Sequence, residues 1–338
     1  MKQGKTTLRN DIELTTASLI LLIAIGAEIL FQSFVLLLGL SETVRNWTIV
    51  IGNQLVFFVV SFVSTRVFGS DLAELTGVKR PPKVFFFPLF LVTAVLCVFA
   101  FAPLAGLFSQ GLKALGYDYT PQYFVPYDNA GLFVLALLAL TFLPMLGEEV
   151  MMRGVLFSGA KKKSPIFAVL FTATVFALFH GNLVQLVHQF LLGAVIGYLV
   201  FLTDSIYAGA VIHGANNACA LLIDYLYLHN KIGARAYGYF TADFSSGLEG
   251  GVLAAVLVGS WVILALLLFL FKRMSDASGL SQVKEKNEES AFAPLPEGEG
   301  REEAPVPEKK PAWIPPALLV GTLLLLLVAN VVSEVMQK

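Results

Sequence analysis

Long apolar runs alternate with short polar segments along almost the whole chain. A transmembrane helix needs about 20 consecutive, predominantly apolar residues, and nine runs of roughly this kind can be marked off. They cover residues 17–40, 47–67, 84–108, 129–152, 165–182, 184–202, 205–227, 249–271 and 315–333. The pattern therefore predicts an all-α, polytopic membrane protein.

The composition agrees with this prediction. Hydrophobic residues make up 57% of the 338 residues, whereas soluble domains contain roughly 45–50%. The first run is longer than the apolar core of a signal peptide, which has about 7–15 residues, so we expect it to be kept as a transmembrane helix. Cys97 and Cys219 both lie in apolar runs, so the sequence indicates no disulfide framework.

Lysine and arginine gather in every second segment between the predicted helices. Because basic residues favour the cytoplasmic side of a membrane, this alternation predicts a cytoplasmic N-terminus. The basic residues expected on the cytoplasmic side include Lys2, Lys5, Arg9, Arg66, Lys79, Arg80, Lys83, Lys161, Lys162, Lys163, Lys272 and Arg273, and the opposite side has only Arg45, Lys113, Lys231, Arg235 and Lys338.

The composition changes near the C-terminus. Residues 275–312 are rich in Glu, Lys, Pro, Gly and Ser, and such a segment cannot bury enough apolar surface to fold alone. We therefore divide the chain into a transmembrane core at 1–274, a disordered cytoplasmic linker at 275–312 and a C-terminal transmembrane helix at 313–338. The last helix is nearly all aliphatic, so we expect it to be an anchor.

Polar residues interrupt three of the apolar runs or lie beside them. Ionisable side chains within a membrane are costly, and they usually mark a functional site or a buried pair. The residues concerned are Glu148, Glu149 and Arg153, then His180 (four residues after Phe176), and then His213, Asn216 and Asn217.

Each of these residues also has a purely structural interpretation. Glu149 and Arg153 are four residues apart, so on a helix they can form an ion pair. An isolated histidine is more often a packing residue than a catalyst, and membrane asparagines can hold helices together at about 0.6 kcal/mol each. Glu148 is the exception, because the same span contains no second cation to offset its charge.

The expected depths of the polar residues bring them together. At about 1.5 Å per residue, Glu148 lies roughly 20 Å from the lysines at 161–163, and His180 lies at a similar depth past Pro165. His213 and Asn217 lie about 12–18 Å past Ser205. One polar layer inside the membrane is therefore predicted.

This layer contains the groups needed to hydrolyse an amide. Glu148 is the candidate general base for a water molecule, and His180 could hold the same water. His213 and Asn217 could stabilise the oxyanion, with Glu149 and Arg153 in supporting roles.

Metal catalysis is the alternative for the same residues. Glu148, His180 and His213 form a plausible Zn²⁺ set with an open position for water. The chain has no His-Glu-x-x-His motif, and we therefore favour direct glutamate catalysis and expect no cofactor.

The three motifs in this order resemble the CPBP family of intramembrane proteases. This family includes the type II CAAX prenyl endopeptidases and the bacterial Abi-type proteins. The similarity rests on Glu-Glu-x-x-x-Arg at 148–153, Phe-x-x-x-His at 176–180 and His-x-x-x-Asn at 213–217, and covers about residues 130–225. The linker and the ninth helix depart from the family's usual eight-helix core.

The resemblance implies an eight-helix hydrolase with a conical cavity that opens toward the cytosol and the lipid. Its implied catalytic residues are Glu148, His180, His213 and Asn217, in the roles given above. The implied substrates are CAAX-type or other membrane-associated peptides, with membrane lipid as a partner and no nucleic acid. We expect the protein in a bacterial cell membrane.

Two other functions remain open on the sequence. Intramembrane Glu and His also build the ion pathways of transporters and proton relays, although no inverted repeat is evident. The chain could also be an immunity or scaffold protein that retains the family's residues without proteolysis.

Overall fold

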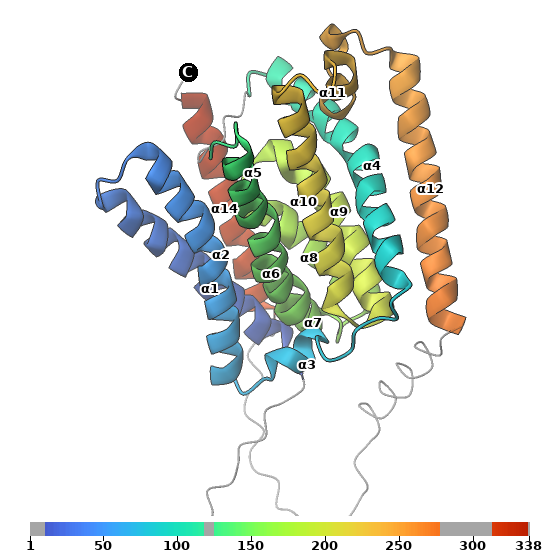
Figure 1. Cartoon of the computed structure of the whole chain (residues 1–338). Helices are drawn as coiled ribbons and strands as arrows, with labels where there is room; N and C mark the ends of the chain where they lie inside the picture. The colour runs from blue at the N-terminus through green and yellow to red at the C-terminus, as the bar shows by residue number, and fades with distance from the viewer. Residues whose placement is uncertain (1–10, 118–124, 278–312, 337–338) are drawn as a thin grey trace, which may run out of the picture.

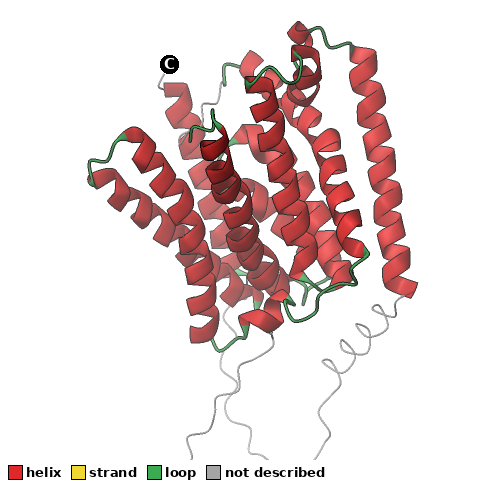
Figure 2. Cartoon of the chain, viewed as in Figure 1, coloured by secondary structure: helices red, strands yellow, loops and turns green. Residues whose placement is uncertain are grey.

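The structure is a computed structural model and describes residues 11–117, 125–277 and 313–336. Its regular elements in these ranges are all helical (Figure 2). In chain order they are α1 (Leu14–Leu37), α2 (Glu42–Val67), α3 (Leu72–Thr76), α4 (Phe86–Ala114), α5 (Ala130–Leu137), η1 (Leu138–Phe142), α6 (Leu143–Glu149), η2 (Val150–Leu156), α7 (Phe157–Ala160), α8 (Pro165–Phe179), α9 (Leu183–Thr203), α10 (Ile206–Leu228), α11 (Ala234–Thr241), η3 (Phe244–Ser246), α12 (Gly250–Ala277) and α14 (Ile314–Met336).

The long helices form a bundle that suits a lipid environment (Figure 1). Eight helices in the described ranges are long and apolar enough to cross a membrane. Large side chains such as Leu30, Leu37 and Leu325 are more than 70% exposed on the outside of the bundle, where lipid rather than water can cover them. The all-α, polytopic membrane architecture is therefore confirmed.

The fifth predicted span differs from the others. The sequence predicts a crossing over 165–182, but α8 has 15 residues and is too short to cross the hydrocarbon core, which needs about 20. Pro165 starts the helix after a Ser164 cap, and Gly181 ends it in a left-handed conformation with φ of 66°. Asn182 then caps α9 by accepting a hydrogen bond from Gln185 N at 2.8 Å.

Residues 130–160 form one long helix with two π-helical turns, η1 and η2. Glu148 and Glu149 are the last residues of the α-helical segment between these turns. Single π-turns inside α-helices occur frequently at functional sites because the extra residue per turn redirects side chains. The helix also continues eight residues beyond the predicted end at 152.

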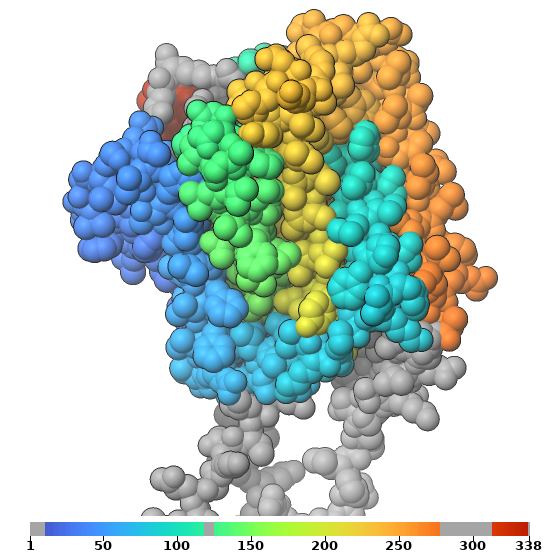
Figure 3. All heavy atoms as spheres, in the orientation of Figure 1, coloured from blue at the N-terminus to red at the C-terminus, as the bar shows by residue number. Residues whose placement is uncertain are grey.

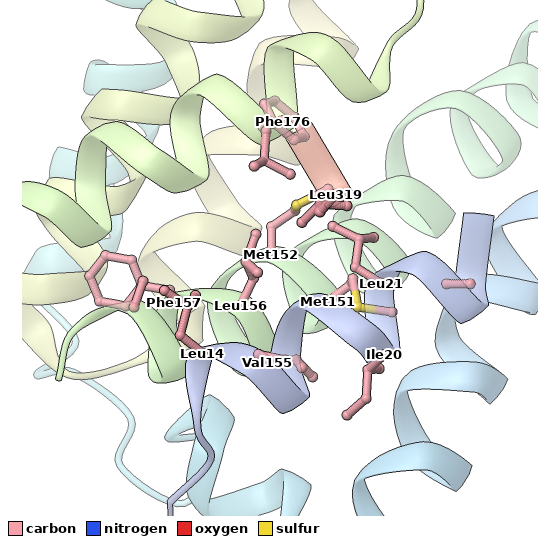
Figure 4. Packing of buried hydrophobic residues seen from close by; sticks show 14 of the residues in the cluster. Leu14, Ile20, Leu21, Met151, Met152, Val155, Leu156, Phe157, Phe176 and Leu319 are labelled. Atoms are coloured by element: carbon pink, nitrogen blue, oxygen red, sulfur yellow. The ribbon is translucent and has the colours of Figure 1, made fainter. Parts of the chain in front are cut away.

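Two hydrophobic clusters hold the bundle together, and the first of them includes the end of this helix. One joins α1, η2, α8 and α14 through side chains such as Leu21, Met152, Phe176 and Leu319 (Figure 4). The other joins α4, α9, α10 and α12, where the rings of Phe86, Phe90 and Phe271 stack. The polar site lies on helices held by both clusters.

Gly193 and Gly197, four residues apart on α9, allow close helix packing. A Cβ at Gly193 would lie 3.1 Å from Ala173 Cα, and one at Gly197 would lie 3.5 Å from Val169 Cα. The two small residues therefore let α8 and α9 pack backbone against backbone.

In the space-filling view the 130–160 helix lies between α2 and α10, and α4 follows on the far side of α10 (Figure 3).

The expected linker lies mostly outside the described residues. Its first residues, 275–277, form the end of α12, and residues 278–312 are not described.

Candidate active site

A buried ion pair lies within the site. Arg153 Nη1 donates to Glu149 Oε1 at 2.9 Å, and both side chains are fully shielded from solvent. The Arg153 guanidinium also lies 4.7 Å from the centre of the Phe176 ring and donates to the Gly193 carbonyl at 3.4 Å. The pairing predicted from the i, i+4 spacing is confirmed, and the two charges compensate each other.

His213 connects the two glutamates. Its Nδ1 lies 2.9 Å from Glu149 Oε1, and its Nε2 lies 3.9 Å from Glu148 Oε2. A carboxylate at Nδ1 favours a proton on that nitrogen, and Nε2 is the ring nitrogen that faces Glu148. The arrangement matches a carboxylate that orients a catalytic histidine.

Glu148 is held by a residue that the sequence analysis did not identify. Gln54 Nε2, on α2, donates to Glu148 Oε1 at 2.9 Å. The other oxygen, Oε2, is buried and has no hydrogen-bond partner among the described residues. A buried carboxylate oxygen without a partner is costly, so this atom is the natural place for a water molecule or a substrate group.

The only sequence signal for Gln54 is a polar amide side chain within a predominantly apolar span. Hydropathy alone does not separate this glutamine from Asn53, its neighbour on α2. The close approach of α2 to α6 is what brings Gln54 to Glu148. A Cβ at Gly147, the residue before Glu148, would lie 2.9 Å from the Gln54 carbonyl oxygen.

His180 lies at the C-terminal end of α8, beside this cluster. Its Nδ1 lies 2.8 Å from the Phe176 carbonyl, so Nδ1 is the donor and Nε2 remains an acceptor. Its ring meets the Phe176 ring edge to face at 4.8 Å, and it interacts electrostatically with Glu148 and His213. The early end of α8 thus places His180 among the residues of the other two motifs.

Asn217 faces a different partner from His213. Its Nδ2 donates to the Leu140 carbonyl in η1 at 3.2 Å. An asparagine amide carries two N–H donors, so this bond leaves one of them for a substrate. The proposed oxyanion role of Asn217 stays a prediction.

A second polar pair lies beside the site. Asn216 Oδ1 lies 3.1 Å from His188 Nε2, and Asn216 Nδ2 donates to the Ala94 carbonyl at 3.4 Å. These contacts tie α10 to α9 and α4. Asn216 therefore has a helix-packing role, in contrast to its neighbour Asn217.

Glu28 is a third acidic residue near the site, and the sequence analysis did not identify it. It lies on α1, is 7% exposed, and interacts electrostatically with Glu148. A glutamate in an apolar run is a signal that the sequence offers, but the run containing Glu28 has no histidine or arginine to suggest a site.

The alternative metal set was Glu148, His180 and His213. Among the described residues, no three His, Cys, Asp or Glu side chains are placed to hold one metal ion. The Nδ1 atoms of His213 and His180 bond to protein acceptors, so Nε2 is the nitrogen of each ring that could ligate a metal.

We expect Gly209→Ala to damage the site. Gly209 on α10 faces Glu149, and an added Cβ would overlap Glu149 Oε2 and crowd Ile196. Because Glu149 is locked between Arg153 and His213, it cannot move away at low cost, and overpacking of this kind costs about 1–3 kcal/mol.

The measurement is thermal unfolding of the purified protein in detergent. Gly259→Ala on α12 is the matched control, since nothing lies within 4 Å of its added Cβ. Equal melting temperatures for the two variants would show that Glu149 does not approach α10 as closely as the structure places it.

Comparison with protein families finds a match for the segment that contains the site. Residues 130–219 match the family described as "Type II CAAX prenyl endopeptidase Rce1-like". This segment contains the three motifs, from Glu148 to Asn217. Comparisons with curated proteins and with solved structures found no match.

Proposed function

We propose, from the membership of this chain in the type II CAAX prenyl endopeptidase family, that it is an intramembrane endopeptidase in which Glu148 activates water. The observation that carries the proposal is the unpartnered Glu148 Oε2 atom, which faces His213 Nε2 across 3.9 Å. A water molecule can bond to both atoms at ordinary distances of about 2.8 Å.

The proposed first step is attack of this water on a peptide carbonyl. Glu148 removes a proton from the water as its oxygen bonds to the carbonyl carbon. Gln54 keeps the carboxylate in place by donating to Oε1, so Oε2 is the oxygen that faces the water. His180 Nε2 is the second acceptor that can orient the water.

The histidine and asparagine of α10 complete the proposal. In this proposal His213 carries a proton on both ring nitrogens before the step begins, and Glu149 stabilises this imidazolium as the triad carboxylate does. His213 Nε2–H and the second N–H of Asn217 then stabilise the oxyanion. When the carbon–nitrogen bond breaks, the proton held by Glu148 passes to the leaving amine.

The substrate and the orientation are part of the same proposal. We propose membrane-associated peptides, including prenylated CAAX peptides, as substrates. The lysines at 161–163, the start of α8 and the N-terminus of the chain are assigned to the cytoplasmic face of a bacterial membrane, on the basis of the positive-inside pattern.

The test is cleavage of a panel of prenylated peptides by the purified protein in detergent, with and without a chelator. We expect cleavage in both conditions, because the proposed general base needs no metal. Loss of cleavage with the chelator and recovery with zinc would replace this mechanism with metal catalysis. Failure to cleave any peptide would contradict the proposed substrate class.

A further inference from the structure

The C-terminal helix α14 runs beside the short helix α8 in the same direction. At the start of α8, Lys163 Nζ lies 4.9 Å from the centre of the Trp313 ring, and Phe167 packs edge to face on the same ring. At the end of α8, Asn330 Nδ2 donates to the Gly181 carbonyl at 2.9 Å. The two helices are thus in contact at both ends of α8.

One face of α14 fastens the helix to the core. Leu319, Leu323 and Leu327 follow at i, i+4 and i+8, and each is less than 9% exposed. Figure 4 shows Leu319 beside Met152 and Leu21, so α14 contacts the cluster that surrounds η2. The opposite face, with Leu325 at 72% exposed, is free for lipid. A helix that served only as a membrane anchor would not need a buried face of this kind.

The contact at Gly181 has a physical cause. Helix α8 ends at Phe179, with His180 as its C-cap, well short of a full crossing. Carbonyl groups at a helix end inside a bilayer cost several kcal/mol when no donor reaches them. Asn330 supplies a donor from another helix, and a Cβ at Gly181 would lie 3.0 Å from that donor.

We propose that Asn330 is a positioning residue that fixes the turn between α8 and α9 and, through it, the ring of His180. The inference rests on the proposed function, because His180 is a proposed catalytic residue. Gly181 directly follows His180, so movement of its carbonyl changes the backbone from which the His180 ring projects. Helix α14, the ninth predicted span, then helps to position a catalytic residue and is not only an attachment to the membrane.

The test compares three variants of the full chain. Asn330→Leu removes the donor and keeps a side chain that branches at the same carbon atom, with a higher helix propensity. Asn330→Gln retains an amide donor. Thr322→Val is the matched control, because it removes a polar group from the outward face of α14, beside Leu318 and Leu325.

Two readouts are measured for each variant. We expect Asn330→Leu to lower kcat by about threefold to tenfold, the effect of one hydrogen bond, with KM unchanged. We also expect faster amide hydrogen exchange in peptides that cover residues 178–186. Asn330→Gln should recover part of both effects, and Thr322→Val should match the wild type.

Two results would overturn the proposal. Wild-type exchange at 178–186 in Asn330→Leu would show that α14 does not hold the turn. A rise in cleavage would show that α14 acts as a lid over the site. Hydrogen exchange does not depend on any substrate, so it decides the role of Asn330 even if the wild type cleaves no peptide, a result that would contradict only the proposed function.

Discussion

Replacing Glu148 with Gln should lower peptide cleavage by about 100-fold to 10,000-fold, the range attributed to a general base. The substitution removes the basic oxygen but keeps a carbonyl oxygen that can accept the bond from Gln54 Nε2. The loss therefore belongs to the chemical step. The measurement is kcat on a prenylated peptide that the wild type cleaves.

Stability is the companion measurement for this variant. The melting temperature in detergent should stay close to that of the wild type, because packing around residue 148 is unchanged. Glu74→Gln, at a partly exposed glutamate paired with Lys79 and Arg80, is the control and should leave cleavage intact. Cleavage retained in Glu148→Gln would remove the general-base role and leave the histidines as candidates.

Replacing Arg153 with Met should cause the largest loss of stability. The change leaves Glu149 buried without its cation, and breaking a buried pair on one side costs about 3–5 kcal/mol. It also removes the contact of the guanidinium with the Phe176 ring. The expected result is a large fall in the melting temperature, or loss of the folded protein.

Two further variants make this result specific. Arg80→Met removes an exposed partner of Glu74 and Asp204 and should cost at most about 1 kcal/mol. Glu149→Gln combined with Arg153→Met removes both charges but keeps an acceptor for His213 Nδ1, and it should recover part of the loss. If Arg153→Met is no more destabilising than Arg80→Met, the ion pair does not carry the stability assigned to it.

The candidate site shows which kind of contact a sequence can predict. The pair Glu149–Arg153 follows from four-residue spacing on a helix, and the structure confirms it. Gln54 lies 94 positions before Glu148, and no spacing rule connects residues on separate helices. The same limit applies to His213, since its partner among the two glutamates depends on how α10 is rotated against α6.

The fold also has some features that follow from the sequence and others that follow only from tertiary packing. The sequence alone determines the apolar segments and hence the all-α membrane class, because each crossing must satisfy its own backbone within one helix. The sequence also shows which polar residues interrupt the apolar runs, and it predicts the ion pair within one helix. Tertiary structure decides that Gln54 and His213 meet Glu148 and that Asn330 of α14 reaches the turn after His180. These features depend on the relative rotation and depth of helices, which packing between distant segments sets and local hydropathy does not encode.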